Sequence, residues 1–126
     1  KQAIDLGYKP FSISTDLHQR NLRGPVIDLA TTMSKLLGLG LSLNEVIACV
    51  TTAPAKVLGI DDYSQGLTGK KARFTVFQLK DHRISMQDSN GNTKAFEKVF
   101  EPSLVILKSN VIEAKTELFS HMEAWA

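Results

Sequence analysis

One acidic residue near the N-terminus lies where enzymes commonly carry their chemistry. Asp16 follows a short stretch with strand character, 11–15, and a Gly24-Pro25 break precedes the next expected helix. In parallel α/β folds, the carboxyl ends of the strands carry the catalytic residues. This order of strand, acid, break and helix indicates an enzyme site at Asp16. On spacing alone, however, such an acid is more often a turn former or a helix cap.

A histidine follows the acid by two residues. If the strand persists beyond Asp16, alternate side chains share one face, and His18 lies beside the carboxylate. A substrate contact and a water-exposed loop histidine are then equally good interpretations of His18.

Helical spacing dominates the first half of the chain. It predicts three helices, over 26–38, 43–50 and 53–58. Pro25 suits the first turn of the first helix. Ser42 and Glu45 form a capping box for the second helix, and Thr52 is expected to cap the third, with Gly59 past its end.

From Gly66 onward the hydrophobic period changes to the alternation typical of strands. The pattern predicts strands over 73–79, 84–88, 95–100 and 104–108. The cluster 88–92 and the pair Ser109-Asn110 are expected to form turns. The last residues, 115–125, have apolar side chains at helical spacing.

Composition excludes several classes of partner. The net charge of +2 is too small to indicate a nucleic acid or an anionic membrane as the partner. No apolar run approaches the roughly 20 residues of a membrane helix. Cys49 is the only cysteine, so an internal disulfide is impossible, and a cytoplasmic location is expected. Its helical neighbours favour a small core residue over a nucleophile.

Further motifs accompany the acid. They are Ser14-Thr15-Asp16-Leu17-His18, Gly24-Pro25-Val26-Ile27-Asp28-Leu29, Val50-Thr51-Thr52-Ala53-Pro54-Ala55, Leu58-Gly59, Gly66-Leu67 and Thr75-Val76-Phe77. Together they resemble the end of the barrel and the start of the small β domain in the amidohydrolase superfamily. The deacetylase-like, dihydroorotase-like and adenine-deaminase-like metallohydrolases are the most similar branch. The resemblance runs from about Leu6 to Ala114.

The resemblance implies an α+β fold, the C-terminal part of a TIM-barrel metallohydrolase joined to a small, mainly antiparallel β domain. Residues 1–59 would supply the last barrel strand and the following helices. Residues 60–114 would form a small β-sandwich portion, and 115–126 a helical tail. Because the chain opens on Lys1 and holds little of the family's metal site, we expect it to be the C-terminal third of a larger hydrolase.

The resemblance also implies a reaction. Such enzymes hydrolyse a C–N bond, in an amide or in a ring amide or amidine, with water activated by a divalent metal, here expected to be zinc. Asp16 matches the family carboxylate that is both metal ligand and catalytic proton carrier, and it is the only residue here that matches that site. The spacing alone makes His18 the candidate substrate contact. The chain contains no His-x-His pair, so we expect it to be inactive and to bind no metal when alone.

The expected partners are a small-molecule substrate and the missing N-terminal barrel portion. A homo-oligomer is also expected, because a strand 11–15 without neighbours exposes both edges and helix 26–38 loses partners for its apolar face. The alternative function is a non-catalytic truncated paralogue that acts as a folding or oligomerisation module.

Overall fold

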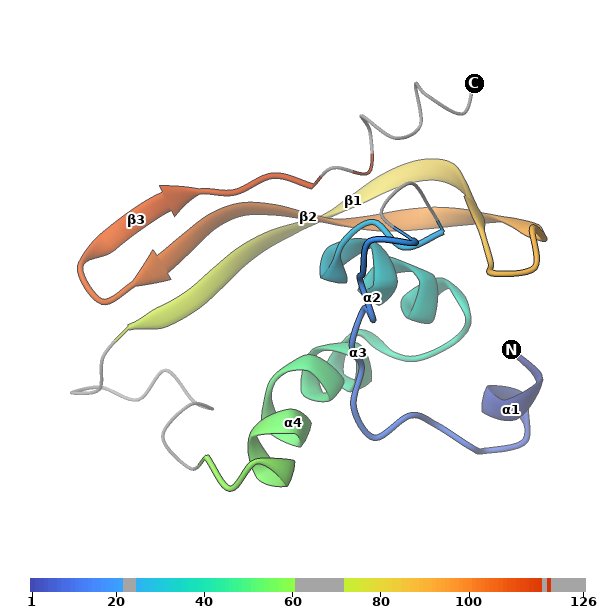
Figure 1. Cartoon of the computed structure of the whole chain (residues 1–126), viewed down its shortest axis with the longest axis horizontal. Coiled ribbons are helices and arrows are strands. Elements are labelled where there is room, and N and C mark those ends of the chain that lie inside the picture. The colour runs from blue at the N-terminus through green and yellow to red at the C-terminus, as the bar shows by residue number, and fades with distance from the viewer. Residues whose placement is uncertain (22–24, 61–71, 117, 119–126) are drawn as a thin grey trace.

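A computed structural model describes residues 1–21, 25–60, 72–116 and 118. The helices and strands are α1 (Gln2–Asp5), α2 (Leu29–Gly38), α3 (Leu43–Val50), α4 (Thr52–Val57), β1 (Arg73–Gln87), β2 (Thr93–Leu107) and β3 (Asn110–Glu113). The sheet lies over the helices, and the end that contains β3 extends beyond them (Figure 1). The predicted change from helices to antiparallel strands is confirmed.

Helix α2 begins later than the sequence spacing predicted. The Asp28 carboxylate accepts a hydrogen bond of 2.6 Å from the Thr31 amide, which makes Asp28 the N-cap. Pro25 therefore lies before the helix and not in its first turn. An aspartate that can satisfy a free amide of the first turn defines a helix start better than a proline that only tolerates one.

The short helices follow their local signals closely. Helix α3 has the predicted capping box, in which Ser42 and Glu45 each bind the other's backbone amide. Helix α4 begins at Thr52, one residue early, and Thr51 is its N-cap without a side-chain hydrogen bond. The Thr52 hydroxyl instead donates to the Ala48 carbonyl of α3, so the predicted Thr52 cap is wrong.

The four predicted strands of the second half merge into two long ones. Strands β1 and β2 pair antiparallel, with register shifts after Val76 and after Asp81 that separate the expected segments. The following turn consists of Lys108 and Ser109, and not of Ser109-Asn110, because Asn110 already pairs with Leu107. Lys108 adopts the positive φ of 58° that the tight turn requires. The described strands form a single sheet of three, in the order β1-β2-β3, and the sandwich partner remains a prediction.

The core lies between the sheet and the helices. One cluster joins α2, α3 and β2 and contains Ala30, Met33, Leu41, Val46 and Phe100. A second cluster contains Ile27, Ile84, Met86, Phe96, Val99 and Leu118. The expectation that the apolar face of the first long helix lacks partners is therefore wrong, because β2 covers it.

A buried serine fastens the helix layer to the sheet. The fully buried Ser34 hydroxyl donates to the Ala30 carbonyl and accepts from the Phe100 amide at 2.9 Å. It thereby gives a partner to a backbone amide of β2, which would otherwise be a buried donor without an acceptor.

Two expectations fall partly on residues outside the described part. Leu118 of the tail is buried against the second cluster, but most of 115–125, and residues 61–71 of the expected 60–114 portion, are not described. Within the described ranges, no helix is both long and apolar enough to cross a membrane.

Candidate functional site

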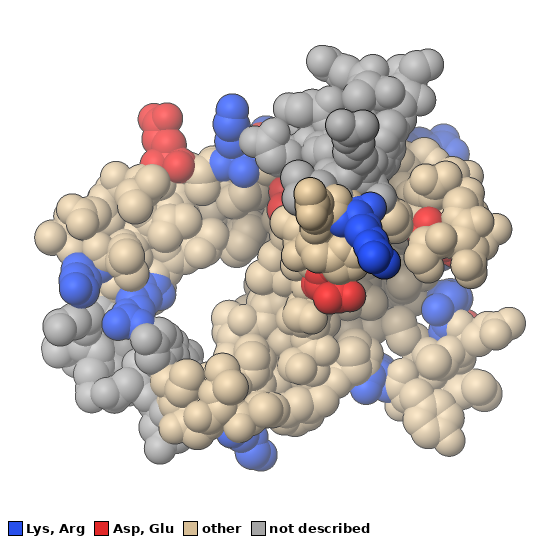
Figure 2. All heavy atoms as spheres, viewed as in Figure 1, with Lys and Arg blue, Asp and Glu red and all other residues tan. Residues whose placement is uncertain are grey.

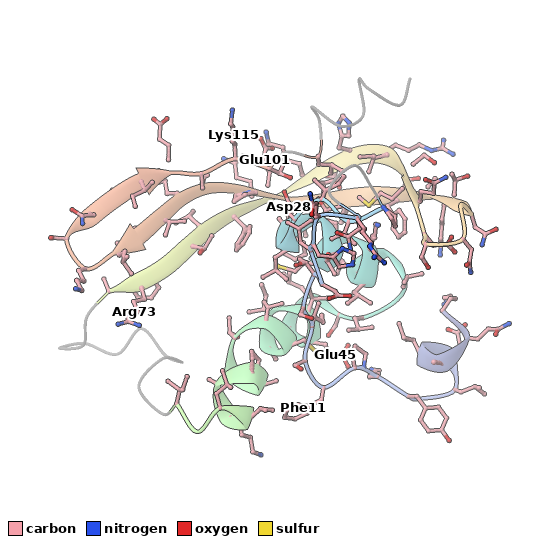
Figure 3. All side chains as sticks on the ribbon, in the orientation of Figure 1. Phe11, Asp28, Glu45, Arg73, Glu101 and Lys115 are labelled. Carbon is pink, nitrogen blue, oxygen red and sulfur yellow. The ribbon has the colours of Figure 1, made fainter. Side chains whose placement is uncertain are left out.

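The segment that leads to Asp16 lies along helix α3. The Ile13 amide donates to the Cys49 carbonyl at 3.0 Å, and the Cys49 thiol donates to the Pro10 carbonyl at 3.2 Å. Near the start of the segment, Lys9 forms an ion pair with Glu45. Figure 3 shows Glu45 on α3 and Phe11 on this segment. Helix α3 therefore holds the segment at Lys9, Pro10 and Ile13.

The predicted strand 11–15 does not form. No described strand runs beside it, and its one backbone hydrogen bond to the other described residues runs from Ile13 to Cys49 at the end of α3. A parallel barrel strand exists only as part of a ladder with neighbours on both sides. Because the described residues give it helices and no strand as neighbours, the segment stays irregular.

The backbone leaves the extended conformation at Asp16. Its φ of 51° is in the left-handed region, which aspartate tolerates better than most residues do, and its side chain is exposed. Because the backbone leaves the extended conformation here, the alternation that would place Asp16 and His18 on one strand face does not apply. The carboxylate stands open to any group that approaches the end of the segment.

A small polar network defines the loop after Asp16. The Asn21 side chain donates to the Asp16 carbonyl at 2.9 Å and accepts from the His18 amide at 2.8 Å. The His18 Nδ1 accepts from the Arg20 amide at 3.1 Å, so in a neutral ring Nε2 carries the hydrogen. His18 is exposed and can offer that N–H to a ligand. The sequence signal for Asn21 was only its type, because asparagine side chains often bridge a tight loop.

The chain beyond the loop is also fastened. The Lys35 ammonium donates to the carbonyls of Pro25, at 2.7 Å, and Gln87, at 3.0 Å. Burial lowers the pKa of Lys35, while nearby Asp88 opposes that shift. Lys35 is thus a structural link between the residues that follow the loop and the β1–β2 hairpin.

The ion pair at the start of the segment belongs to the capping box. The Glu45 carboxylate binds Lys9 through one oxygen and Ser42 through the other. The hydrogen bond from Lys9 is the main cause that lowers the pKa of Glu45 to about 2, and the bonds from Ser42 add to it. Glu45 therefore stays charged at every pH at which the protein would normally work.

The described residues do not by themselves make a metal centre. A carboxylate such as Asp16 suits zinc, but a zinc site needs three or four protein ligands. No three His, Cys, Asp or Glu side chains come together in the part of the chain that is described. Asp16 fits a metal only as one ligand of a site that other residues complete.

Two hollows flank α3 and neither contains Asp16. The larger, of about 490 Å³, lies under the sheet and is lined by apolar side chains that include Ile47, Phe77 and Phe100. In Figure 2 the space-filled molecule is hollowed between sheet and helices, and the described Lys and Arg side chains are spread over several elements.

Comparison with known proteins identifies the family of this chain. Residues 1–112 match the amidohydrolase family. The chain belongs to the amidohydrolase family. Members of this family generally use divalent metals.

Its relatives within the family carry hydrolase names. It is 43% identical over 112 residues to Deacetylase Atu3266 of Agrobacterium fabrum, covering 89% of this chain and 28% of that protein. A dihydroorotase of Methanopyrus kandleri is 35% identical over 71 residues, 56% of this chain and 16% of that protein.

Solved structures of amidohydrolase relatives show the same backbone. A dihydroorotase crystal structure superposes with a TM-score of 0.87 at 42% identity, over 91% of this chain and 30% of that chain. An adenine deaminase crystal structure superposes with a TM-score of 0.83 at 36% identity, over 89% of this chain and 31% of that chain. The chain spans less than a third of the length of these relatives.

Proposed function

We propose that this chain supplies the Asp16 loop to the active site of a metal-dependent amidohydrolase that hydrolyses a C–N bond. The observation that carries the proposal is the exposed Asp16 carboxylate at the end of a segment fastened to α3, in a chain of this family. The bond would be an amide, as in deacetylation, or a ring amide or amidine.

In this proposal Asp16 and His18 have different chemical roles. The Asp16 carboxylate accepts the proton of the attacking water and then delivers it to the leaving nitrogen. The exposed His18 Nε2–H donates to an oxygen or nitrogen of the substrate. The divalent metal of such an enzyme, with zinc as our expectation, would activate water, and Asp16 would be one of its ligands.

The rest of the proposed site comes from elsewhere. We propose that a barrel portion preceding this sequence supplies the other metal ligands and the neighbours that turn the 11–15 segment into a strand. The chain alone would then be inactive, and would self-associate or require that portion. The single cysteine suits a cytoplasmic enzyme.

The test is a fusion protein. The N-terminal part of the Agrobacterium deacetylase, which this chain does not cover, is joined to residues 1–126 and supplied with zinc. Hydrolysis of N-acetyl amides and of cyclic amides is compared between the fusion and the chain alone. We expect turnover only by the fusion. A folded, zinc-loaded fusion without turnover would favour the non-catalytic module, and turnover by the chain alone would contradict the division of the site.

A further inference from the structure

The end of helix α3 carries an unusual pair of contacts to the segment before Asp16. The last carbonyls of a helix have no partner within it and must find one elsewhere. In α3, the Thr51 hydroxyl donates to the Ile47 carbonyl and the Thr51 amide to the Ala48 carbonyl. The Cys49 carbonyl receives its hydrogen from Ile13.

The side chain of the same residue holds the same segment. The Cys49 thiol lies 3.2 Å from the Pro10 carbonyl oxygen and donates to it. Burial raises the pKa of this thiol, so it keeps the hydrogen that the contact needs. Cys49 is only 6% exposed, so water does not compete well for either contact.

The two contacts bracket the segment. Pro10 and Ile13 are three residues apart, and Asp16 follows Ile13 by three more. A chain fixed at Pro10 and Ile13 has few ways to reach Asp16, whose φ of 51° lies in the left-handed region. Glu45, one helical turn before Cys49, adds the exposed Lys9 pair on the same helix face.

We infer that Cys49 is a positioning residue for Asp16, acting through its thiol contact with Pro10 and its carbonyl contact with Ile13. This inference rests on the proposed function for its catalytic meaning. Its structural content concerns only the described chain: without the thiol, the 10–13 segment loosens from α3 and the Asp16 backbone loses its fixed orientation.

The test uses the 126-residue chain labelled for NMR. The exchange rate of the Ile13 amide is measured relative to that of Val46, whose amide bonds to Ser42 inside α3 and reports opening of the helix itself. Residual dipolar couplings of the Asp16 amide report the orientation of its backbone. The variants are Cys49→Ala, which removes the donor, and Cys49→Ser, which keeps one.

A matched control removes a buried donor elsewhere. Ser34→Ala also deletes one heavy atom and a hydrogen bond in the core, but at the contact between α2 and β2. If Cys49→Ala proves too unstable to fold, Cys49→Val fills the space of the thiol without the donor, at the cost of one additional methyl group, and is compared with Cys49→Ser.

In Cys49→Ala we expect the Ile13 exchange rate to rise roughly three- to ten-fold relative to Val46, the effect of one weak hydrogen bond with its packing. The Asp16 coupling should shrink as well. Cys49→Ser should restore both, and Ser34→Ala should leave both unchanged. An unchanged ratio in Cys49→Ala, no rescue by serine, or an equal change in Ser34→Ala would overturn the inference. Failure of the fusion to hydrolyse substrate would refute the proposed function and leave this result standing.

Discussion

Gly38, the last residue of α2, has no room for a side chain. A Cβ built on Gly38 would lie 2.1 Å from Cδ1 and 2.8 Å from Cε1 of Phe96. The Phe96 ring is 5% exposed and packs with Ile84 and Val99 in the second core cluster, so it cannot swing into solvent. Gly38→Ala therefore forces the helix and the sheet apart or the ring out of its packing.

Two opposing effects decide the size of the change. Alanine is favoured over glycine in a helix by about 1 kcal/mol. Overpacking of a core costs about 1 to 3 kcal/mol. We expect the clash to win, because both close contacts involve a buried ring, and the net loss of unfolding free energy to be about 1 kcal/mol. The melting temperature should fall by about 4 °C.

The assay is urea unfolding of Gly38→Ala, Phe96→Leu and the double variant. Because leucine vacates the position of the ring edge, the double variant should be more stable than the sum of the single effects predicts. Gly59→Ala is the control, since Gly59 has a positive φ of 64° and nothing within 4 Å of its Cβ position. Gly59→Ala should lose unfolding free energy through backbone strain alone, and Phe96→Leu should not restore that loss. A Gly38→Ala protein that is more stable than the parent would refute this account of the packing.

Three further predictions concern charge, activity and association. Glu45→Gln should lower stability most above about pH 4.3, the ordinary pKa of an unfolded glutamate. Because Lys9 and Ser42 hold the folded pKa of Glu45 at about 2, that difference should shrink as the pH falls and vanish below about 2 in acid-unfolding curves. The isolated chain should show no deacetylase or deaminase turnover with added zinc, and robust turnover abolished by Asp16→Ala would contradict this. Light scattering at micromolar concentration should find an oligomer, because apolar side chains such as Val111, 64% exposed, lie on β3, the edge strand of the described sheet; a clean monomer would argue against it.

Helix caps were predictable from the sequence because they depend on groups only a few residues apart. The Ser42 and Glu45 capping box uses groups within one turn, so it survives whatever the rest of the chain does. The same holds for Gly59, which takes a positive φ just past α4. The sequence also contains the signal for the start of α2, since Asp28 precedes Thr31 at capping spacing, whereas Pro25 indicates a start three residues too early.

The features that the sequence did not predict depend on contacts between residues far apart in the chain. Strand character over 11–15 reflects suitability for a sheet, and a sheet requires neighbouring strands that the described residues do not provide. The contact of Cys49 with Pro10 joins residues 39 positions apart, and a cysteine gives no sequence signal for such a role. Asp16 was found through family motifs, while its left-handed backbone, which redirects His18, was not foreseeable from the alternation of a strand.

The most direct test of the central claim is the effect of Asp16→Asn on the zinc-loaded fusion with the Agrobacterium deacetylase portion. Asparagine keeps the size and the left-handed preference of Asp16 but cannot carry the proton. Asp81→Asn is the matched control, since Asp81 is an exposed carboxylate on β1 paired with Lys98. We predict that kcat for amide hydrolysis falls at least about 100-fold in Asp16→Asn, the lower range for loss of a general acid–base group, and is unchanged in Asp81→Asn. An Asp16→Asn fusion that hydrolyses amides as fast as its parent would contradict the account.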